Sequence, residues 1–427
     1  ACLMLTQKAA LSCFLSANSV LPNPTLVHSR QPDQGYSLRG DGSDYNHLWD
    51  GQSVLDVFCI SRTLSATAPE LIQGLLNNFL AIQGEDGFID MKPGLAGQRS
   101  RLLATPLLCG LVLRLDEVLD NPEFMQAAFP KLLAFFESWF TPHNDRDQDG
   151  IPEWTHPMQS GHEDHPIYSP WNSWSLGVRI SKTESPALCS FLYQECRALI
   201  QIAKKIGAEE RISELEAIAA RLSQAVENAW DTDSSLYLDR DRDTHQSPEG
   251  RLLAQTNGPG LILIQRSFTH PARLLFNIQP GESNRPTPTI YIHGLSPAGR
   301  HRIEPIRRDQ FRAGAERISY TTDSVFSTIE QIEIRDLGSQ DLVSIYQVGL
   351  THQDQSLFTP LWAGIPEYER AAQLVEKNLC NPDAFWKPFG VPLCADVSHE
   401  PEARIYRASS LFWHQVIGEG LLAYGFR

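Results

Sequence analysis

The sequence predicts a mainly α-helical fold of paired helices with one antiparallel β-domain inserted into it. Over about 300 residues, apolar side chains recur at spacings of three and four, and breaks that contain Gly or Pro separate the helical segments. From about residue 251 to residue 350 the pattern changes to short β-rich runs separated by Pro, Gly and Asn. We therefore expect a first helical part over 1–250, a β-rich insert over 251–350 and a last helical part over 351–427.

The helical segments come in pairs joined by short breaks. Ser185 is the expected N-cap of one long helix, and Pro186 occupies its first turn, where the missing N–H has no helical partner to lose. Paired amphipathic helices bury their apolar stripes against one another in a solenoid or in a closed ring, and the periodicity leaves both open. The predicted helices cover 53–64, 69–83, 105–119, 122–140, 185–207, 209–230, 367–379 and 409–424.

The bulk composition excludes several classes of partner. The chain has 427 residues and a formal net charge of −15, so it has no electrostatic reason to bind nucleic acid or an anionic membrane. Its hydrophobic fraction of 42% is that of a folded globular protein. Residues 1–20 match neither a secretion signal nor a membrane span, because a Gln and a Lys interrupt the apolar run.

The cysteines favour a reducing compartment. None of the eight forms a C-x-x-C pair, which indicates reduced thiols and neither a disulfide framework nor a zinc site. We therefore expect a soluble cytoplasmic protein. The sequence begins without Met, and we expect its natural N-terminus to be missing or processed.

An Asp-rich segment has the spacing of a calcium-binding loop. Asp145, Asp147 and Asp149 alternate and Gly150 follows, as at the start of an EF-hand loop in which alternate carboxylates converge on one Ca²⁺. His156 stands at the twelfth position, where such a loop has a closing Glu. The segment is therefore either a structural calcium site or a turn that caps the next element through side-chain hydrogen bonds.

A second polar segment places Glu163 and Asp164 between His162 and His165, just before the aromatic residue Trp171. A carboxyl group that donates a proton near neutral pH needs a raised pKa, which burial or a neighbouring carboxylate provides. The segment is either a catalytic centre or an exposed acidic loop with solvated charges. A transition-metal site on the two histidines is a weaker alternative.

These two segments resemble the catalytic region of the glycoside hydrolase family 63 group of six-hairpin glycosidases, which includes bacterial mannosylglycerate and glucosylglycerate hydrolases. The resemblance covers the helical part from about residue 40 to 425 and leaves the β-insert out. It implies an (α/α)6 toroid and an inverting enzyme that hydrolyses α-linked glucosides or mannosides. The matching motifs are Asp-Gly-x-Pro-Glu at 149–153, Ser-Gly-x-acid-acid-x-Pro at 160–166, and the segments 45–50, 79–83, 87–89, 360–364, 381–382 and 385–392.

The resemblance also implies catalytic residues. Glu163 falls where the family has its catalytic Asp, and Asp164 follows it, so Glu163 is the expected general acid with Asp164 as the alternative. The general base is expected in the loop before the last inner helix, at Glu402 or else Glu400, which are otherwise solvated loop charges. Glu419 is a rival base, but it sits near the far end of that helix.

The candidate substrate-binding residues come from several parts of the chain, and Trp49 and Asp50 are expected to form the floor of the pocket. Trp49 offers a stacking face and Asp50 accepts sugar hydroxyls; alternatively, Trp49 lies in the core and Asp50 caps the helix near Ser53. Arg407 lies before the last helix and is otherwise a surface residue. The remaining candidates are Tyr36, Gln83, Trp171, Trp386 and Gln415.

Two other functions remain open at this stage. A toroid that binds a glycan or a protein without catalysis is compatible with the Glu at position 163, and a glycoside phosphorylase would share the fold. Serine hydrolase, P-loop and dinucleotide-binding motifs are missing from the sequence. We expect no required cofactor beyond a structural calcium ion, and a small carbohydrate as the partner. The sugar, its linkage and the oligomeric state are not predicted.

Overall fold

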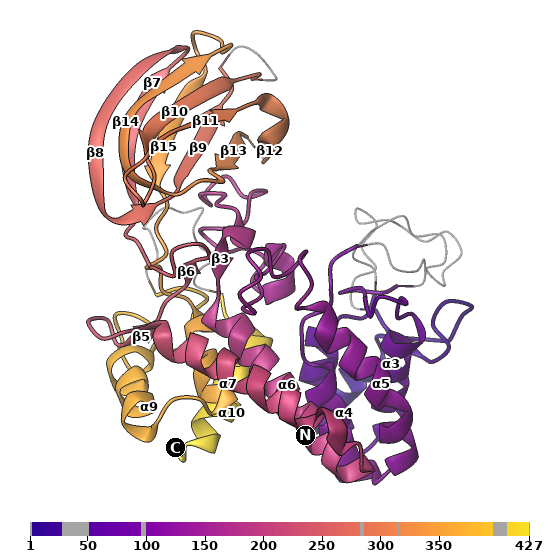
Figure 1. Cartoon of the computed structure of the whole chain (residues 1–427). Coiled ribbons are helices and arrows are strands. Elements are labelled where there is room, and N and C mark those ends of the chain that lie inside the picture. Colours follow the sequence, from indigo (N-terminus) through magenta and orange to yellow (C-terminus); the bar gives the residue numbers. More distant parts are fainter. Residues whose placement is uncertain are drawn as a thin grey trace.

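A computed structural model of the chain describes residues 2–27, 51–94, 100–281, 286–314, 316–395 and 408–426. It consists of a helical part and a β-rich part that stands at one end of it (Figure 1). Among the described residues, no helix is long and apolar enough to cross a lipid bilayer.

Helices far apart in the chain form a closed ring. Along the ring each inner helix packs against the next inner helix, and the last packs against the first, so the ring closes between the two ends of the helical part. The inner helices in the described part of the chain are α2 (Val54–Leu64), α4 (Leu108–Leu119), α6 (Pro186–Ile206), α8 (Thr359–Ala363) and α10 (Leu411–Ala423). The predicted toroid has six hairpins, and this count stays a prediction because the described residues contain five inner helices.

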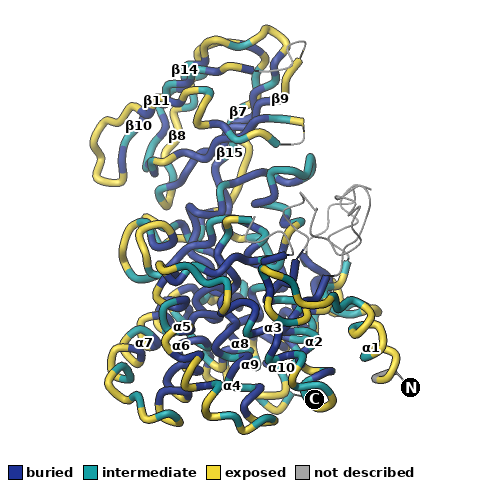
Figure 2. The backbone as a smooth tube through the Cα atoms, turned by 90° about the vertical axis from the view of Figure 1, so that its right-hand side faces the viewer, coloured by how far each residue is buried: buried dark blue, intermediate teal, exposed yellow. Residues whose placement is uncertain are grey.

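The outer helices cover the ring and alternate with the inner ones along the chain. The tube in Figure 2 shows that buried backbone concentrates inside the helical part and that exposed backbone follows its periphery. The outer helices are α3 (Pro69–Ala81), α5 (Pro122–Ser138), α7 (Ile212–Asn228) and α9 (Tyr368–Leu374), with a π-helical turn at Val375–Leu379, and the helix α1 (Cys2–Leu11) packs on α2.

All five inner helices run in the same direction. Residues from their C-terminal halves lie around one cavity, to which the five helices contribute Arg62, Arg114, Gln201, Trp362 and Glu419 in chain order. Their N-terminal ends meet at the opposite side of the ring. We call these two sides the C-terminal rim and the N-terminal rim.

The helix boundaries follow the signals in the sequence with small differences. Ser53 caps α2 by accepting the N–H of Asp56, as expected of a Ser before an apolar run. Ser185 stands at the N-cap of α6, but its side chain makes no capping hydrogen bond. Helix α4 begins at Leu108, three residues after the predicted Thr105, which precedes Pro106 and is therefore disfavoured in the helical conformation.

The β-rich part is a sandwich of two antiparallel sheets with its own apolar core, which side chains such as Phe276, Ile292 and Phe326 fill from both sheets. One sheet has the order β11–β10–β14–β8 and the other β12–β13–β9–β15–β7. The strands are β7 (Arg251–Asn257), β8 (Gly260–Ala272), β9 (Leu274–Gln279), β10 (Thr289–Leu295), β11 (His301–Ile306), β12 (Arg312–Ala313), β13 (Ile318–Thr321), β14 (Phe326–Arg335) and β15 (Leu342–Gln347).

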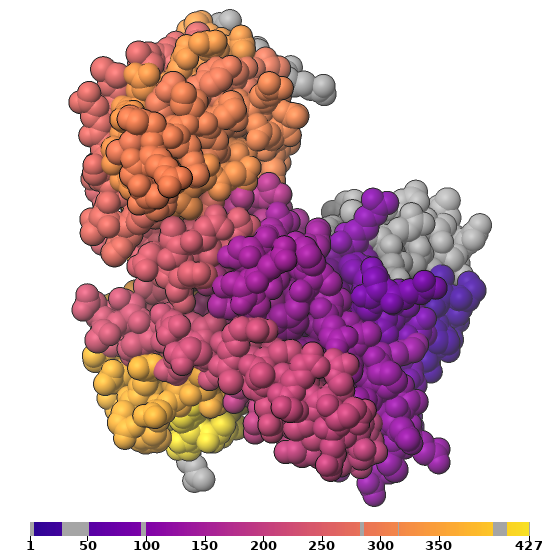
Figure 3. All heavy atoms as spheres, viewed as in Figure 1, coloured from indigo at the N-terminus to yellow at the C-terminus, as the bar shows by residue number. Residues whose placement is uncertain are grey.

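The sandwich rests on the segment that continues from the N-terminal rim (Figure 3). The Arg317 guanidinium donates to the Ser173 carbonyl oxygen over 2.6 Å, and the Asn277 amide donates to the Leu176 carbonyl oxygen over 3.0 Å. At the neck between the two parts, the buried Arg273 pairs with Asp241 over 2.6 Å. The sandwich therefore buttresses the loops of this rim. The domain limits at residues 250 and 350 remain a prediction.

Candidate active site

The segment around Gln159 is tied to the N-terminal rim by hydrogen bonds. The Thr105 hydroxyl, in the loop before α4, donates to the Gln159 carbonyl oxygen over 2.6 Å. The Gln159 side-chain amide donates to the Leu103 carbonyl oxygen over 3.0 Å. The Trp413 indole at the start of α10 donates to the Gly161 carbonyl oxygen over 3.1 Å. These bonds fix the residues that precede Glu163.

Gly161 is required by the shape of this turn. Its φ is +71°, in the left-handed region that favours glycine, and a Cβ built on it would lie 3.1 Å from the Leu55 side chain and 3.4 Å from that of Phe412. The turn therefore packs directly on the first residues of α2 and α10. Helices α2 and α10, from opposite ends of the helical part, therefore meet beneath Glu163 and Asp164.

Glu163 extends from this turn with an exposed side chain. Among the described residues, its carboxyl group has no hydrogen-bond or ion-pair partner. Although the side chain is exposed, the surrounding protein removes part of the water around the carboxyl group. This desolvation is the largest cause of the raised pKa of Glu163. Lys92 lowers the pKa, whereas Asp164 and Asp56 raise it. The balance keeps a proton on Glu163 to a higher pH than on an ordinary Glu.

Asp164 is held in a different way. Its Oδ1 accepts a hydrogen bond of 2.8 Å from the Asn172 amide, and its side chain is half-buried. Of the two neighbouring acids, Glu163 is therefore the one whose carboxyl group is unengaged within the described part of the chain.

A buried cluster of histidines and aspartates lies beneath the same turn. Nε2 of His165 is 3.2 Å and Nε2 of His352 is 3.1 Å from Oδ2 of Asp354. Nδ1 of His162 is 3.7 Å from the other oxygen of Asp354, and Nε2 of His352 is 3.6 Å from Asp239. Burial lowers the pKa of His165 to about 3, and the hydrogen bond to Asp354 only partly opposes it. A cavity of about 20 Å³ beside His162 and Asp239 has room for one water molecule.

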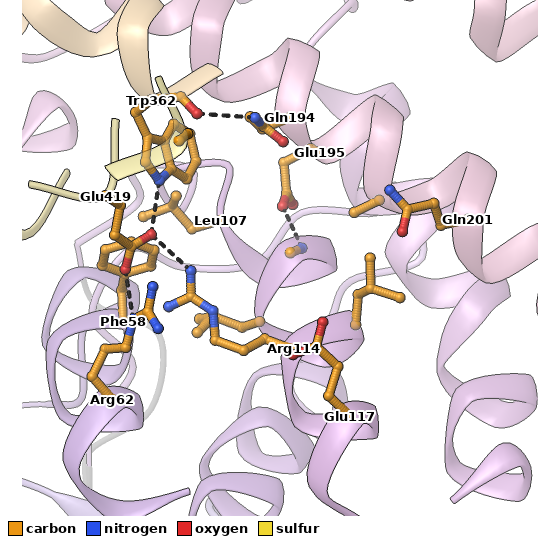
Figure 4. A pocket seen from close by; sticks show the side chains of 15 residues that line it. Phe58, Arg62, Leu107, Arg114, Glu117, Gln194, Glu195, Gln201, Trp362 and Glu419 are labelled. Atoms are coloured by element: carbon orange, nitrogen blue, oxygen red, sulfur yellow. Dashed lines mark hydrogen bonds and ion pairs between the residues drawn. The ribbon is translucent and has the colours of Figure 1, made fainter. Parts of the chain in front are cut away.

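The C-terminal rim contains a larger cavity of about 470 Å³, shown in Figure 4, with Glu419 at its edge. The Glu419 carboxylate accepts hydrogen bonds from Arg62 at 2.7 Å, Arg114 at 2.9 Å, the Trp362 indole at 3.0 Å and the Gln415 amide at 3.1 Å. Burial alone would raise the pKa of Glu419, but these donors outweigh it and the pKa lies below its ordinary value. Glu419 therefore joins α10 to α2, α4 and α8.

Two further polar side chains of this cavity, Glu195 and Gln194, are also engaged by the protein. Both oxygens of Glu195 accept backbone N–H groups at the start of α4, from Cys109 and Gly110, at 2.8 Å each. The Gln194 amide donates to the carbonyl oxygens of Trp362 and Ala363. These contacts join helices around the ring, while Nη1 of Arg114 is buried without a hydrogen-bond partner in the described part of the chain.

The Asp-rich segment divides its carboxylates between two neighbouring groups. Asp145 and Asp147 lie with Glu153, and Asp149 lies with Glu184 and His245; within each group, one ligand atom per residue falls within 4.8 Å of the others. Oδ1 of Asp145 and Oε1 of Glu153 are buried and have no hydrogen-bond partner in the described part of the chain. Burial raises the pKa of Glu153 to about 8. Acceptor-only oxygens that lack partners fit a hard cation such as Ca²⁺.

Comparison with known protein families identifies the helical part. Residues 60–265 match the family model described as the mannosylglycerate hydrolase MGH1-like glycoside hydrolase domain. Over these residues, just under half of the chain, the protein resembles the glycosidases of the glycoside hydrolase family 63 group. This confirms the family resemblance that the sequence motifs indicate. No curated protein matches the chain significantly.

Solved structures share the fold of this protein at low sequence identity. An uncharacterised conserved protein from Thermus thermophilus has a TM-score of 0.55 and 16% identity, over 89% of this chain and 82% of that one. The GH63 mannosylglycerate hydrolase from the same organism, in complex with glucose, has a TM-score of 0.53 and 17% identity over the same shares. Its complex with Tris and D-glycerate has a TM-score of 0.53 and 15% identity, over 89% of this chain and 85% of that one.

Several predicted site residues of the protein cannot be placed. The candidate bases Glu402 and Glu400 lie outside the described residues, as do the candidate sugar contacts Tyr36, Trp49, Asp50 and Arg407. The N-cap of α2 is Ser53, so the alternative of Asp50 in that position is wrong.

The other predicted sugar contacts lie in different environments. The Gln83 amide donates to the Gly87 and Lys131 carbonyl oxygens, which ties α3 to α5. Gln415 points to Glu419 on the C-terminal rim. Trp171 stacks on His156 with ring centroids 5.4 Å apart, and Trp386 is 60% exposed. Of these four, Trp171 lies closest in the chain to Glu163, with Asn172 beside it bonded to Asp164.

Some residues at the rim were not predicted. Lys92, His352 and Asp354 belong to no sequence motif, and only the fold brings them to Glu163 and its flanking histidines. Glu153 could have been found, because its spacing from Asp145 places a further carboxylate within the Asp-rich loop. Glu184 precedes the helix-starting Ser185 and carries no signal of its own.

Proposed function

We propose that this protein hydrolyses α-linked glucosides or mannosides with inversion, and that Glu163 is its general acid. The observation that carries the proposal is the position of Glu163 at the rim where the N-termini of the inner helices converge, with an unengaged carboxyl group and a raised pKa. A general acid works best when it stays protonated near the operating pH and meets the leaving oxygen directly.

The choice of Glu163 over Asp164 follows from their partners. An acid that must approach a substrate oxygen needs a free carboxyl group, and Asn172 already engages that of Asp164. Asp164 acts through its charge, which raises the pKa of Glu163. The additional methylene of Glu163, relative to the Asp of related enzymes, lets it reach further across the rim.

The proposed general base is Glu402, with Glu400 as the alternative. The chain leaves the described structure after residue 395 and returns at 408, and the Leu393 N–H donates to the Ala408 carbonyl oxygen over 3.0 Å. Both ends of this segment therefore lie together, and α10 begins at the N-terminal rim. This position supports a base on the same side of the ring as Glu163. In an inverting enzyme the two carboxyl groups lie roughly 6.5–9.5 Å apart, which leaves room for a water molecule.

The proposed reaction is a single displacement. Glu163 donates its proton to the glycosidic oxygen as the bond to the anomeric carbon breaks. The base removes a proton from a water molecule, whose oxygen attacks the opposite face of that carbon. The products are the free sugar, with inverted anomeric configuration, and the aglycone with a hydroxyl group.

We further propose that Asp145 and Asp147, together with Glu153, hold one structural Ca²⁺. Asp149, which the spacing predicts as a third ligand, lies in the neighbouring group with Glu184 and His245. The buried oxygens without partners support this proposal, because removing a carboxylate from water without a partner is costly. The ion would anchor the start of the segment that leads to Glu163, and it takes no part in the reaction.

The test is a panel of α-glucosides and α-mannosides, including glycerate conjugates, followed by NMR of the product anomer in the first minutes. We expect release of the β-anomer from at least one member of the panel. Release of the α-anomer, or no release accompanied by sugar-dependent thermal stabilisation, would refute the proposal. Turnover that requires added phosphate would identify a phosphorylase instead.

A further inference from the structure

The carboxylate of Asp354 lies directly beneath the turn that carries Glu163. It is 1% exposed and sits at the N-cap of the short helix before α8, where its Oδ1 accepts the Ser356 N–H over 2.7 Å. Its Oδ2 contacts His165 at 3.2 Å and His352 at 3.1 Å. Asp354 therefore joins the inner ring to the residues on both sides of the acidic pair.

The direction of the His165 hydrogen bond follows from a second contact. The Ile167 N–H donates to Nδ1 of His165 over 3.0 Å, so Nδ1 carries a lone pair. In the neutral ring the proton is then on Nε2, and Nε2 donates it to Asp354. The pKa of His165 is low, so its ring stays neutral. The two histidines hold the pKa of Asp354 well below its usual range, so its carboxylate stays charged. The bond therefore joins a neutral donor to an anion.

The same tautomer argues against a metal ion in the cluster. His162, His165 and Asp354 have the composition and spacing of a transition-metal site. A metal ligand must present a lone pair, however, and Nε2 of His165, the nitrogen that faces Asp354, carries a hydrogen. Asp354 instead receives the two imidazoles of His165 and His352, at 3.2 and 3.1 Å, while His162 approaches its other oxygen to 3.7 Å without a hydrogen bond.

We propose that Asp354 is the positioning residue of the general acid. It acts through His165 and holds the turn from His162 to His165 in the conformation that presents Glu163 to the leaving oxygen. This inference rests on the proposed function of Glu163.

Trp413 anchors the turn at Gly161, before Glu163, and Asp354 anchors it at His165, after Glu163. The Ser169 hydroxyl donates to the Glu163 carbonyl oxygen, and Asn172 donates to Asp164. Both of these bonds lie within one segment and would move with it. Asp354 is 189 residues from His165 in the chain, and it ties the turn to α8 across the ring. A displacement of about 1 Å at a catalytic group is enough to cost a hundredfold in rate.

The test uses the dependence of rate on the leaving group. The substitution Asp354→Asn keeps the side-chain oxygen that caps the following helix but removes the anion that receives the histidine N–H groups. General acid catalysis matters for an alkoxide leaving group and not for fluoride, which departs without a proton. For Asp354→Asn we expect kcat on methyl α-glucoside or α-mannoside to fall by about 10- to 100-fold. We expect KM to stay within about twofold, and kcat on the corresponding glycosyl fluoride within about threefold.

Asp341→Asn is the matched control. Asp341 is also 1% exposed and accepts two backbone N–H groups, from Gly281 at 2.8 Å and Gly338 at 2.9 Å, but it lies in the β-sandwich. Its loss should lower thermal stability and leave the ratio of the two rates unchanged. Equal losses on glycoside and fluoride in Asp354→Asn, or no loss on either, would overturn the proposal.

Glu163→Gln, measured in parallel, separates this inference from the proposed function. If Glu163→Gln lacks the selective loss on the glycoside, Glu163 is not the acid and the proposed function fails. If Glu163→Gln shows that loss and Asp354→Asn does not, only the positioning role fails. Elemental analysis tests the remaining alternative, a transition-metal site. One zinc per chain in the wild type that is lost in Asp354→Asn would identify Asp354 as a metal ligand and would overturn the proposal.

Discussion

Glu419 on the C-terminal rim and Glu163 on the N-terminal rim differ in how the protein engages their carboxyl groups. On the C-terminal rim, Glu419 has four donors, and Asp116 pairs with Lys205 over 2.7 Å. On the N-terminal side, Glu163 has no partner among the described residues, and Asp145 and Glu153 each keep a buried oxygen without one. Folded proteins satisfy their buried acids unless another role requires them free. The comparison therefore separates acids that close the ring from acids that remain available to a substrate or a cation.

The largest effect should come from exchanging the free acid for its neutral isostere. Glu163→Gln removes the proton donor, so kcat should fall about 10²- to 10⁴-fold on substrates with an alkoxide leaving group. Because no described partner is lost, the thermal unfolding midpoint should not fall. Asp164→Asn should keep most of the activity. A Glu163→Gln variant that retains full activity while Asp164→Asn loses it would assign the acid to Asp164.

Truncation of the engaged acid should produce the opposite pattern. Glu419→Ala leaves Arg62 and Arg114 without their shared carboxylate and should cost about 2–4 kcal/mol of unfolding free energy, measured by urea denaturation, with kcat nearly unchanged. Since the pKa of Glu419 is depressed in the fold, its contribution is present at neutral pH and is lost as pH falls through the folded pKa. The difference between wild type and Glu419→Gln should therefore shrink below about pH 4. A constant difference down to about pH 3 would contradict the ion-pair explanation.

Calcium should stabilise the N-terminal side selectively. At a concentration about one hundred times the dissociation constant, bound Ca²⁺ adds about 2.7 kcal/mol, which raises the unfolding midpoint by a few °C relative to EDTA-treated protein. Asp147→Asn should abolish the shift, whereas Asp309→Asn, at an exposed position of the β-sandwich, should not. An equal midpoint with Ca²⁺ and with EDTA would leave the Asp-rich segment as a capping turn.

The smallest effects should appear in the pH profile of kcat/KM. The alkaline limb of this profile reports the pKa of the general acid in the enzyme without substrate. Lys92 lowers the pKa of Glu163, so Lys92→Met should move this limb to higher pH. Asp164 raises it, so Asp164→Asn should move the limb to lower pH. Each shift should be roughly 0.3–1 unit. Shifts of the same sign in both variants would show that the limb reports another group.

The fold was predictable where the signal is local. The periodicity and the capping residues located the helices, and alternation located the strands, because both depend on residues within one element. Ring closure was not predictable in the same way, since it depends on contacts such as that of Glu419 with Arg62, which are 357 residues apart. The sequence motif predicts Glu163 because Gly161 and Pro166, on either side of Glu163, indicate a turn. It could not reach Asp354, whose partner His165 is distant in the chain.

The contact between the sandwich and the acid-bearing segment has a consequence for synthesis of the chain. The backbone of Gly314 packs against the Pro170 carbonyl oxygen, and the Arg317 guanidinium donates a hydrogen bond to the Ser173 carbonyl oxygen. A ribosome that has translated only the first 250 residues has made the acid but not the surface that supports its loop. The loop that carries Glu163 therefore gains this support only after the inserted strands have been translated and have paired.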